Sequence, residues 1–167
     1  NKGVVLFKLG KAEEAEASFA AAKALKDHDN INNNLGAVAL KADDVSGAKE
    51  LFTASLGAGD KVNYNLGIVN IIQGDYQAAI NYFGNTPSYN LALAKYLNGD
   101  VEGAWRTASE VEESPYRAYL LAVIAANQDK PDAMYSNLEK AALTCKDPQY
   151  MKDHAKTDLE FAKYWNE

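Results

Sequence analysis

Residues that could carry out catalysis or bind a metal are few and far apart in this sequence of 167 residues. Neither His28 nor His154, the two histidines, has a partner at the spacing of metal ligands. The one cysteine, Cys145, follows a predicted helix and has no neighbouring base to activate its thiol. No nucleophile, base and orienting group occur together. We therefore expect no catalytic, cofactor-binding or metal-binding residues, and no enzyme activity.

Asparagine recurs at one position of a longer pattern, and its chemistry suits contact with a peptide backbone. It stands two residues before a small residue at Asn1, Asn34, Asn65 and Asn90. Its amide offers both the donor and the acceptor that one peptide unit needs. Helices lie ~8–10 Å apart and an extended chain advances ~3.3 Å per residue, so each asparagine would meet about every third residue of a bound strand. Alternatively, these amides only bridge neighbouring helices.

Composition and charge argue against other classes of partner. The chain is 47% hydrophobic and 24% charged, which is typical of a globular domain. Its net charge of −6 has the wrong sign for phosphate backbones or anionic lipid. The longest apolar run, residues 119–126, is far shorter than the roughly 20 residues that cross a bilayer. We expect a protein or peptide partner, no nucleic acid and no direct membrane insertion, while self-association remains possible.

Four columns of residues recur in the same phase, with spacings of 33, 31, 25 and 30 residues. They are Gly3, Gly36, Gly67, Ala92 and Ala122; Gly10, Asp43, Gly74, Gly99 and Asp129; Ala15, Ala48, Ala79, Ala104 and Met134; and Phe19, Phe52, Phe83, Ala108 and Leu138. The columns predict five pairs of antiparallel helices. A small residue in the first helix lets the second approach closely, Gly or Asp ends the first helix, and the third and fourth columns share one face of the second.

The helices and their ends can be placed from the same signals. We predict helices near residues 1–9, 12–25, 30–41, 45–56, 61–73, 75–84, 87–98, 101–112, 115–127 and 131–143, and no strand. All four prolines stand where a helix should begin. Residues 146–167 should form a terminal cap that breaks near Thr157, the first residue of a capping box, with Trp165 in its core.

The second and third repeats resemble the tetratricopeptide repeat (TPR). The residues that carry this resemblance are Asn34-Leu35-Gly36 with Ala48 and Phe52, and Asn65-Leu66-Gly67 with Gly74-Asp75-Tyr76, Ala79 and Phe83. It implies an all-α, TPR-like α-solenoid of antiparallel helical hairpins that forms an irregular, right-handed superhelix. We expect a single domain over 1–167 with units of about 1–28, 29–59, 60–85, 86–113 and 114–145 and a cap over 146–167. Residue 1 falls inside a repeat, so we expect a fragment of a longer protein.

One spacing is much shorter than the others. The 25 residues between the third and fourth repeats are about nine fewer than a 34-residue repeat has. We expect the loss to fall in the second helix of the third repeat, and a bend near residues 84–90. We also expect the apolar residues to be spread along a thin stack instead of being gathered in one centre.

The resemblance also implies a function, because first helices line the concave face of TPR-like stacks and some peptide-binding members carry an asparagine ladder there. We expect a non-catalytic protein–protein interaction module that binds an extended peptide or partner segment on that face. The predicted peptide-binding residues are Asn34, Asn65, Asn90, Lys61, Tyr64, Ile68, Tyr89, Leu93, Tyr96, Tyr116 and Tyr119. Any one of these tyrosines could equally serve packing.

The main alternative is a structural spacer or oligomerisation arm of a larger, envelope-associated protein. The sequence does not decide between the cytoplasm and the bacterial periplasm. A resemblance to bacterial envelope TPR lipoproteins suggests the periplasm, where the protein would be an outer-membrane-associated lipoprotein.

Overall fold

The computed structural model of the chain describes residues 1–165 and contains no strand over that range. Its α-helices are α1 (Lys2–Lys8), α2 (Ala12–Leu25), α3 (Asp29–Lys41), α4 (Val45–Thr53), α5 (Asp60–Ile72), α6 (Tyr76–Phe83), α7 (Tyr89–Leu97), α8 (Val101–Glu110), α9 (Pro115–Asn127), α10 (Pro131–Thr144) and α11 (Pro148–Ala155). Two 3₁₀ helices, η1 (Leu56–Ala58) and η2 (Leu159–Tyr164), complete it. None of the described helices is long and apolar enough to cross a membrane.

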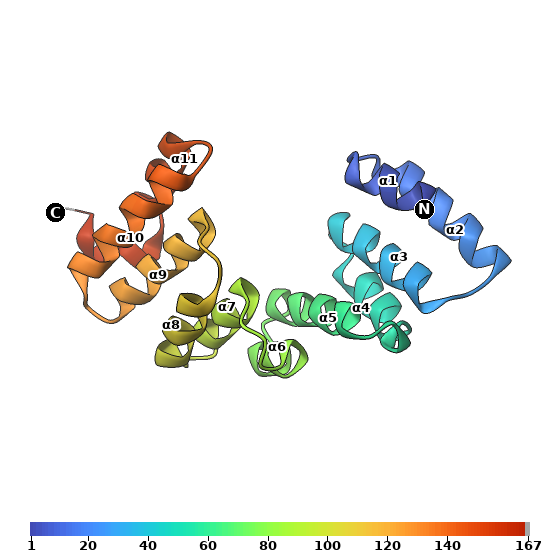
Figure 1. The fold of residues 1–167 in the computed structure, drawn as a ribbon, viewed down its shortest axis with the longest axis horizontal. Helices are drawn as coiled ribbons and strands as arrows, with labels where there is room; N and C mark the ends of the chain where they lie inside the picture. The colour runs from blue at the N-terminus through green and yellow to red at the C-terminus, as the bar shows by residue number, and fades with distance from the viewer. Residues whose placement is uncertain (166–167) are drawn as a thin grey trace. The chain divides into compact units, whose positions relative to one another are not determined.

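The chain divides into two compact units, Asn1–Gly84 and Asn85–Glu167. In the first, α1–α2, α3–α4 and α5–α6 pack as hairpins, and α2 and α4 also pack on the first helices that follow them (Figure 1). In the second, α7–α8 and α9–α10 pack in the same way, α11 packs on α10, and η2 packs on α9. The prediction of an all-α, TPR-like fold of antiparallel helical hairpins is confirmed.

In each hairpin of the N-terminal unit the two helices pack together through a glycine–phenylalanine contact. A Cβ placed on Gly36 would lie 2.6 and 2.7 Å from ring carbons of Phe52, which is itself fully buried. Gly3 meets Phe19 and Gly67 meets Phe83 in the same way. The first column is therefore glycine here because the phenylalanine of the fourth column fills the space where a side chain would stand.

The first helix of every hairpin ends at a residue with positive φ. These residues are Gly10, Asp43, Gly74, Gly99 and Asp129, with φ between 55° and 85°. At the second hairpin the amide N–H of Asp43 donates to the carbonyl of Leu40, and that of Asp44 donates to the carbonyl of Ala39. The other four turns have the equivalent pair of bonds, which is the Schellman arrangement that satisfies the last carbonyls of a helix.

The repeats around the short spacing differ from the expectation in one respect. The second helix α6 has eight residues, only one fewer than α4. The first helix α7 has nine residues where α3, α5 and α9 have 13, so the shortening falls on α7 more than on α6. Ser88 is its N-cap and accepts from the amide of Leu91, so Pro87 precedes the cap instead of opening the helix. The chain divides at this place, and the bend near residues 84–90 remains a prediction.

The terminal cap breaks where the sequence predicts, although its details differ. α11 ends at Ala155 and η2 begins at Leu159, but the residue that caps η2 is Asp158, which accepts from the amide of Glu160. The Thr157 hydroxyl instead donates to the carbonyl of His154. The prediction that Trp165 lies in the core is wrong, because its side chain is 47% exposed.

The buried apolar residues form several clusters, each confined to neighbouring hairpins. One joins Ala48 and Phe52 of α4 to Val62, Leu66 and Val69 of α5. Another joins α7, α8 and α9, and a third joins α9 and α10 to Phe161 of the cap. This distribution agrees with the expectation of apolar residues spread along a stack.

The glycine–phenylalanine contact yields a stability prediction. Gly36→Ala should lower the free energy of unfolding by about 1–2 kcal/mol, because overpacking costs ~1–3 kcal/mol and the better helix propensity of alanine offsets up to ~1 kcal/mol of it. Urea unfolding followed by circular dichroism measures the change. Adding Phe52→Leu reproduces the Ala122–Leu138 combination of the fifth hairpin. The loss of free energy of unfolding in the double variant should therefore be smaller than the sum of the losses in the two single variants. A Gly36→Ala variant as stable as the natural sequence would contradict the argument.

The turn residues give a prediction of the opposite sign. Asp43 has a φ of 61°, and its carboxylate makes no hydrogen bond within the described residues. Asp43→Gly should raise the free energy of unfolding by up to about 1 kcal/mol, since glycine adopts this conformation without steric cost. Asp43→Ala is the matched control and should not stabilise. Equal unfolding midpoints for the two variants would show that positive φ costs nothing at this turn.

Candidate functional site

In the N-terminal unit, the predicted asparagines lie on neighbouring first helices and have different surroundings. Asn34 on α3 is half-buried, and its side chain makes no hydrogen bond within the described part of the chain. Asn65 on α5 is also half-buried, and its side-chain amide donates to Asn33 Oδ1 at 2.8 Å. One amide therefore bridges two first helices, as the alternative interpretation expects, while its neighbour keeps both donor and acceptor available.

The other predicted residues of this unit lie along α5. Helical spacing places Lys61, Asn65, Ile68 and Ile72 on one face, beside the buried stripe that contains Leu66. Lys61 and Ile72 are exposed and Ile68 is half-buried. Tyr64 is 41% exposed, and its ring stands edge-on to Phe83 at 5.4 Å between centroids. Tyr64 therefore both packs within its own hairpin and presents surface to solvent.

In the C-terminal unit, tyrosines from two first helices meet. Tyr89 on α7 and Tyr116 on α9 stand edge to face with ring centroids 6.4 Å apart. Burial, and then the proximity of Tyr116, raise the pKa of Tyr89 above its ordinary value. Tyr116 is 70% exposed, which is high for a large aromatic side chain. Leu93 packs against the same buried cluster as Tyr89, and Asn90 is half-buried on the same helix.

The hydroxyls of the other two predicted tyrosines, Tyr119 and Tyr96, form hydrogen bonds to the terminal cap. Tyr119 donates to Asp158 Oδ2 at 2.6 Å and Tyr96 donates to Glu160 Oε2 at 2.7 Å. Burial is the main cause that raises the pKa of both tyrosines, and the adjoining carboxylate raises it further. These two residues therefore join α7 and α9 to η2, and their rings offer less surface to a partner than Tyr116 does.

Two further aromatic residues, His154 and Tyr150, lie near Tyr119 and were not predicted from the sequence. The ring of His154 on α11 lies 5.4 Å from Tyr119 and is stacked parallel to Tyr150, with centroids 6.0 Å apart. Tyr150 is 63% exposed. The repeat pattern does not indicate these two residues, because the position three residues before the first-column small residue is Tyr64, Tyr89 and Tyr119 in three repeats but Lys152 in α11. We call Tyr89, Tyr116, Tyr119, Tyr150 and His154 the aromatic row.

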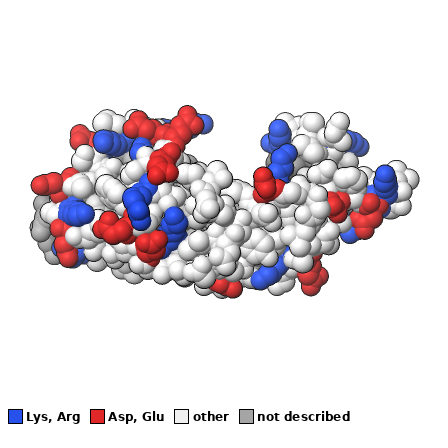
Figure 2. Space-filling model, turned by 60° about the horizontal axis from the view of Figure 1, so that its bottom comes forward, with Lys and Arg blue, Asp and Glu red and all other residues white. Residues whose placement is uncertain are grey.

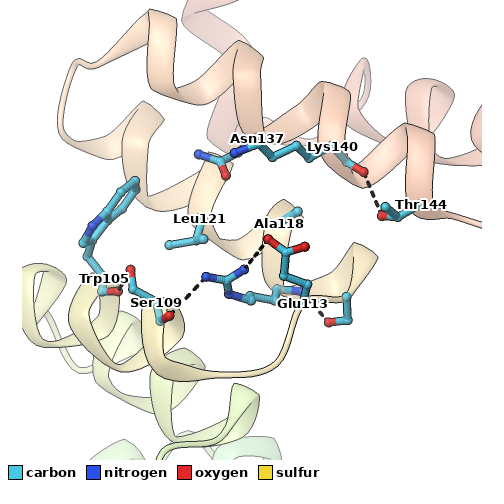
Figure 3. A pocket seen from close by; sticks show the side chains of 10 residues that line it. Trp105, Ser109, Glu113, Ala118, Leu121, Asn137, Lys140 and Thr144 are labelled. Carbon is cyan, nitrogen blue, oxygen red and sulfur yellow. Dashed lines mark hydrogen bonds and ion pairs between the residues drawn. The ribbon is translucent and has the colours of Figure 1, made fainter.

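A polar pocket of about 370 Å³ lies between α8, α9 and α10, apart from the aromatic row. Figure 3 shows Asn137 and Lys140 on α10 across from Ser109 and Glu113, with Trp105 at one end. Its arginine is already engaged: Arg117 donates through Nε to the carbonyl of Ala108 at 2.8 Å and through Nη2 to that of Ser109 at 3.1 Å. Arg117 therefore satisfies the last carbonyls of α8, which is a structural role.

The described residues hold no cluster of metal ligands, and one face of the molecule shows mixed charge. No group of three or more His, Cys, Asp or Glu residues in the described range could hold a metal ion. On the face shown in Figure 2, Lys and Arg side chains lie among Asp and Glu and form no continuous basic surface within the described residues. The arrangement offers aromatic rings and amides for contact with a partner.

Comparisons with known proteins agree with this architecture. No protein-family profile matches the sequence, and no curated protein matches it. Solved structures do match. YrrB, a TPR protein with an unusual peptide-binding site, has a TM-score of 0.69 and 20% identity over 93% of this chain and 89% of its own.

PilF of Pseudomonas aeruginosa has a TM-score of 0.70 and 15% identity over 98% of this chain and 78% of its own. The thermophilic TPR protein TTC0263 of Thermus thermophilus has a TM-score of 0.68 and 15% identity over 91% of this chain and 92% of its own. Identities this low establish the fold and leave the function open. The chain has the TPR fold.

Proposed function

We propose that this chain is a non-catalytic protein-interaction module that binds an extended peptide or partner segment through the faces of its first helices. The observation that carries the proposal is the exposure of Tyr116 beside Tyr89, where two first helices meet. A tyrosine of this kind buries a large area at low entropy cost and keeps a polar tip, which is why tyrosine is common at interfaces. The peptide-binding site described for YrrB, which shares this fold, supports the same kind of function.

The amides contribute a second, weaker element of the proposal. Asn34 keeps both hydrogen-bonding functions available to a bound backbone, and Asn65 keeps its acceptor oxygen while its amide donates to Asn33. Each such hydrogen bond is worth about 0.5–1.5 kcal/mol. In the N-terminal unit the amides alone would therefore hold a peptide weakly, and the stronger contacts of this proposal are those of the aromatic row within the C-terminal unit.

The test uses peptides selected by the protein itself. A phage library of random twelve-residue peptides is panned on the intact chain, and the best binders are titrated by fluorescence anisotropy. Tyr116→Ala should weaken binding of a peptide held by the C-terminal unit ~5–30-fold, equivalent to about 1–2 kcal/mol, and Asn34→Ala should weaken binding of a peptide held by the N-terminal unit roughly 2–10-fold. Tyr82→Ala is the control, because Tyr82 is 37% exposed on the second helix α6. Peptides that bind all variants equally would refute the proposal.

A structural role in self-association is the second candidate, and the first hairpin favours it. Val5 and Leu9 at α1 are 57% and 68% exposed, and Leu25 at the end of α2 is 89% exposed. Sedimentation velocity over a concentration series would show association that Val5→Asp with Leu9→Asp abolishes. A monomer at every concentration would exclude this candidate.

A further inference from the structure

A second surface, distinct from the first-helix faces, lies between α10 and α11. It is an apolar groove of about 500 Å³ whose walls include Leu138, Ala142, Leu143, Met151 and Ala155. A hollow of about 520 Å³ beside η2 continues it and shares Tyr135, Leu138, Ala155 and Lys156 with it. Leu143 is 76% exposed and Tyr135 is 44% exposed. We call these two hollows together the terminal groove.

The repeat geometry explains why this groove is open. α11 packs on α10 as each first helix packs on the preceding second helix within its unit. Its first residue, Pro148, stands 33 residues after Pro115, which opens α9, so Ala155 corresponds to Ala122 of the first column. In the N-terminal unit the first-column residue is covered by a phenylalanine of the second helix. Here η2 packs mainly against α9, and Ala155 remains on the groove wall.

The charges at the groove restrict what could lie in it. Lys152 and Lys156 line it against a single carboxylate, Glu139, in a chain whose net charge is −6. Lys152 has no ion pair within the described residues, and the pair between Lys156 and Asp153, at 3.4 Å, is exposed on both sides. Exposed pairs of this kind contribute little, so both lysines are available to carboxylates of a partner.

We propose that the terminal groove binds an amphipathic helix of a partner protein, with small and medium apolar residues along one face and acidic residues beside them. Such a helix would take the place that a second helix occupies in each of the five hairpins. Its apolar residues would recur at i, i+4 and i+7, which is the spacing that fits a groove formed by two helices. Acidic flanks would meet Lys152 and Lys156, and basic flanks would be repelled.

The experiment measures binding of two designed probes to the full chain by fluorescence anisotropy. Both are 16-residue helical peptides with the same stripe of Leu and Ala, one with glutamates and the other with lysines at the flanking positions. The glutamate peptide should bind at least tenfold more tightly. Lys152→Glu combined with Lys156→Glu should reverse that preference. Equal binding of the two peptides, or none by either, would overturn the proposal.

Matched leucine variants locate the binding. Leu143→Asp should weaken the glutamate peptide at least fivefold. Leu25→Asp should leave it unchanged, because Leu25 is an exposed leucine at the end of α2, outside the terminal groove. Tyr116→Ala should also leave it unchanged, which separates this surface from the peptide site proposed above. A dimer seen by sedimentation velocity and abolished by Leu143→Asp would assign the groove to a second copy and overturn the proposal.

Discussion

The contact between glycine and phenylalanine sets the distance between the paired helices in each hairpin of the N-terminal unit, and the packing of that unit depends on it. In the N-terminal unit the pairs are glycine with phenylalanine, and a Cβ on the glycine would overlap the ring. In the fifth repeat the first column is Ala122 and the fourth column is Leu138, so the two positions change together, as expected if their combined volume is fixed by the packed hairpin. The fourth repeat does not follow this rule, because it has alanine at both positions, Ala92 and Ala108.

This constraint explains why so much of the fold can be predicted from the sequence. A small residue, a left-handed turn and an apolar pair four residues apart are each local requirements, and their spacing places the helices to within a few residues. The exceptions occur where longer-range packing decides. Thr157 and Asp158 are both good N-caps, and only the folded cap selects Asp158. Trp165 is a large apolar residue of the kind expected in a core, but Phe161 is the residue of η2 that is buried.

The candidate site is less predictable for the same physical reason. Tyrosine positions on the first helices follow from the repeat, but their partners do not. The bonds of Tyr119 to Asp158 and Tyr96 to Glu160 span 39 and 64 residues, and no periodic pattern indicates them. Asparagine is equally ambiguous, because an amide that can pair with a peptide can also pair with Asn33 on the next helix. The sequence identifies the candidate residues. Only the structure shows which of their side chains pack within the fold and which are exposed to solvent.

The distribution of the buried residues into separate clusters has a consequence for cooperativity. A chain whose hairpins contact only their neighbours has a free energy of unfolding that is approximately a sum of hairpin and interface contributions. A hairpin that packs on one neighbour opens at a lower free energy than a hairpin that packs on two. Hydrogen-exchange protection is then graded along the sequence instead of uniform. A partner that orders one hairpin transmits its stabilisation to the adjoining hairpins first, and a single melting temperature is an incomplete description of such a molecule.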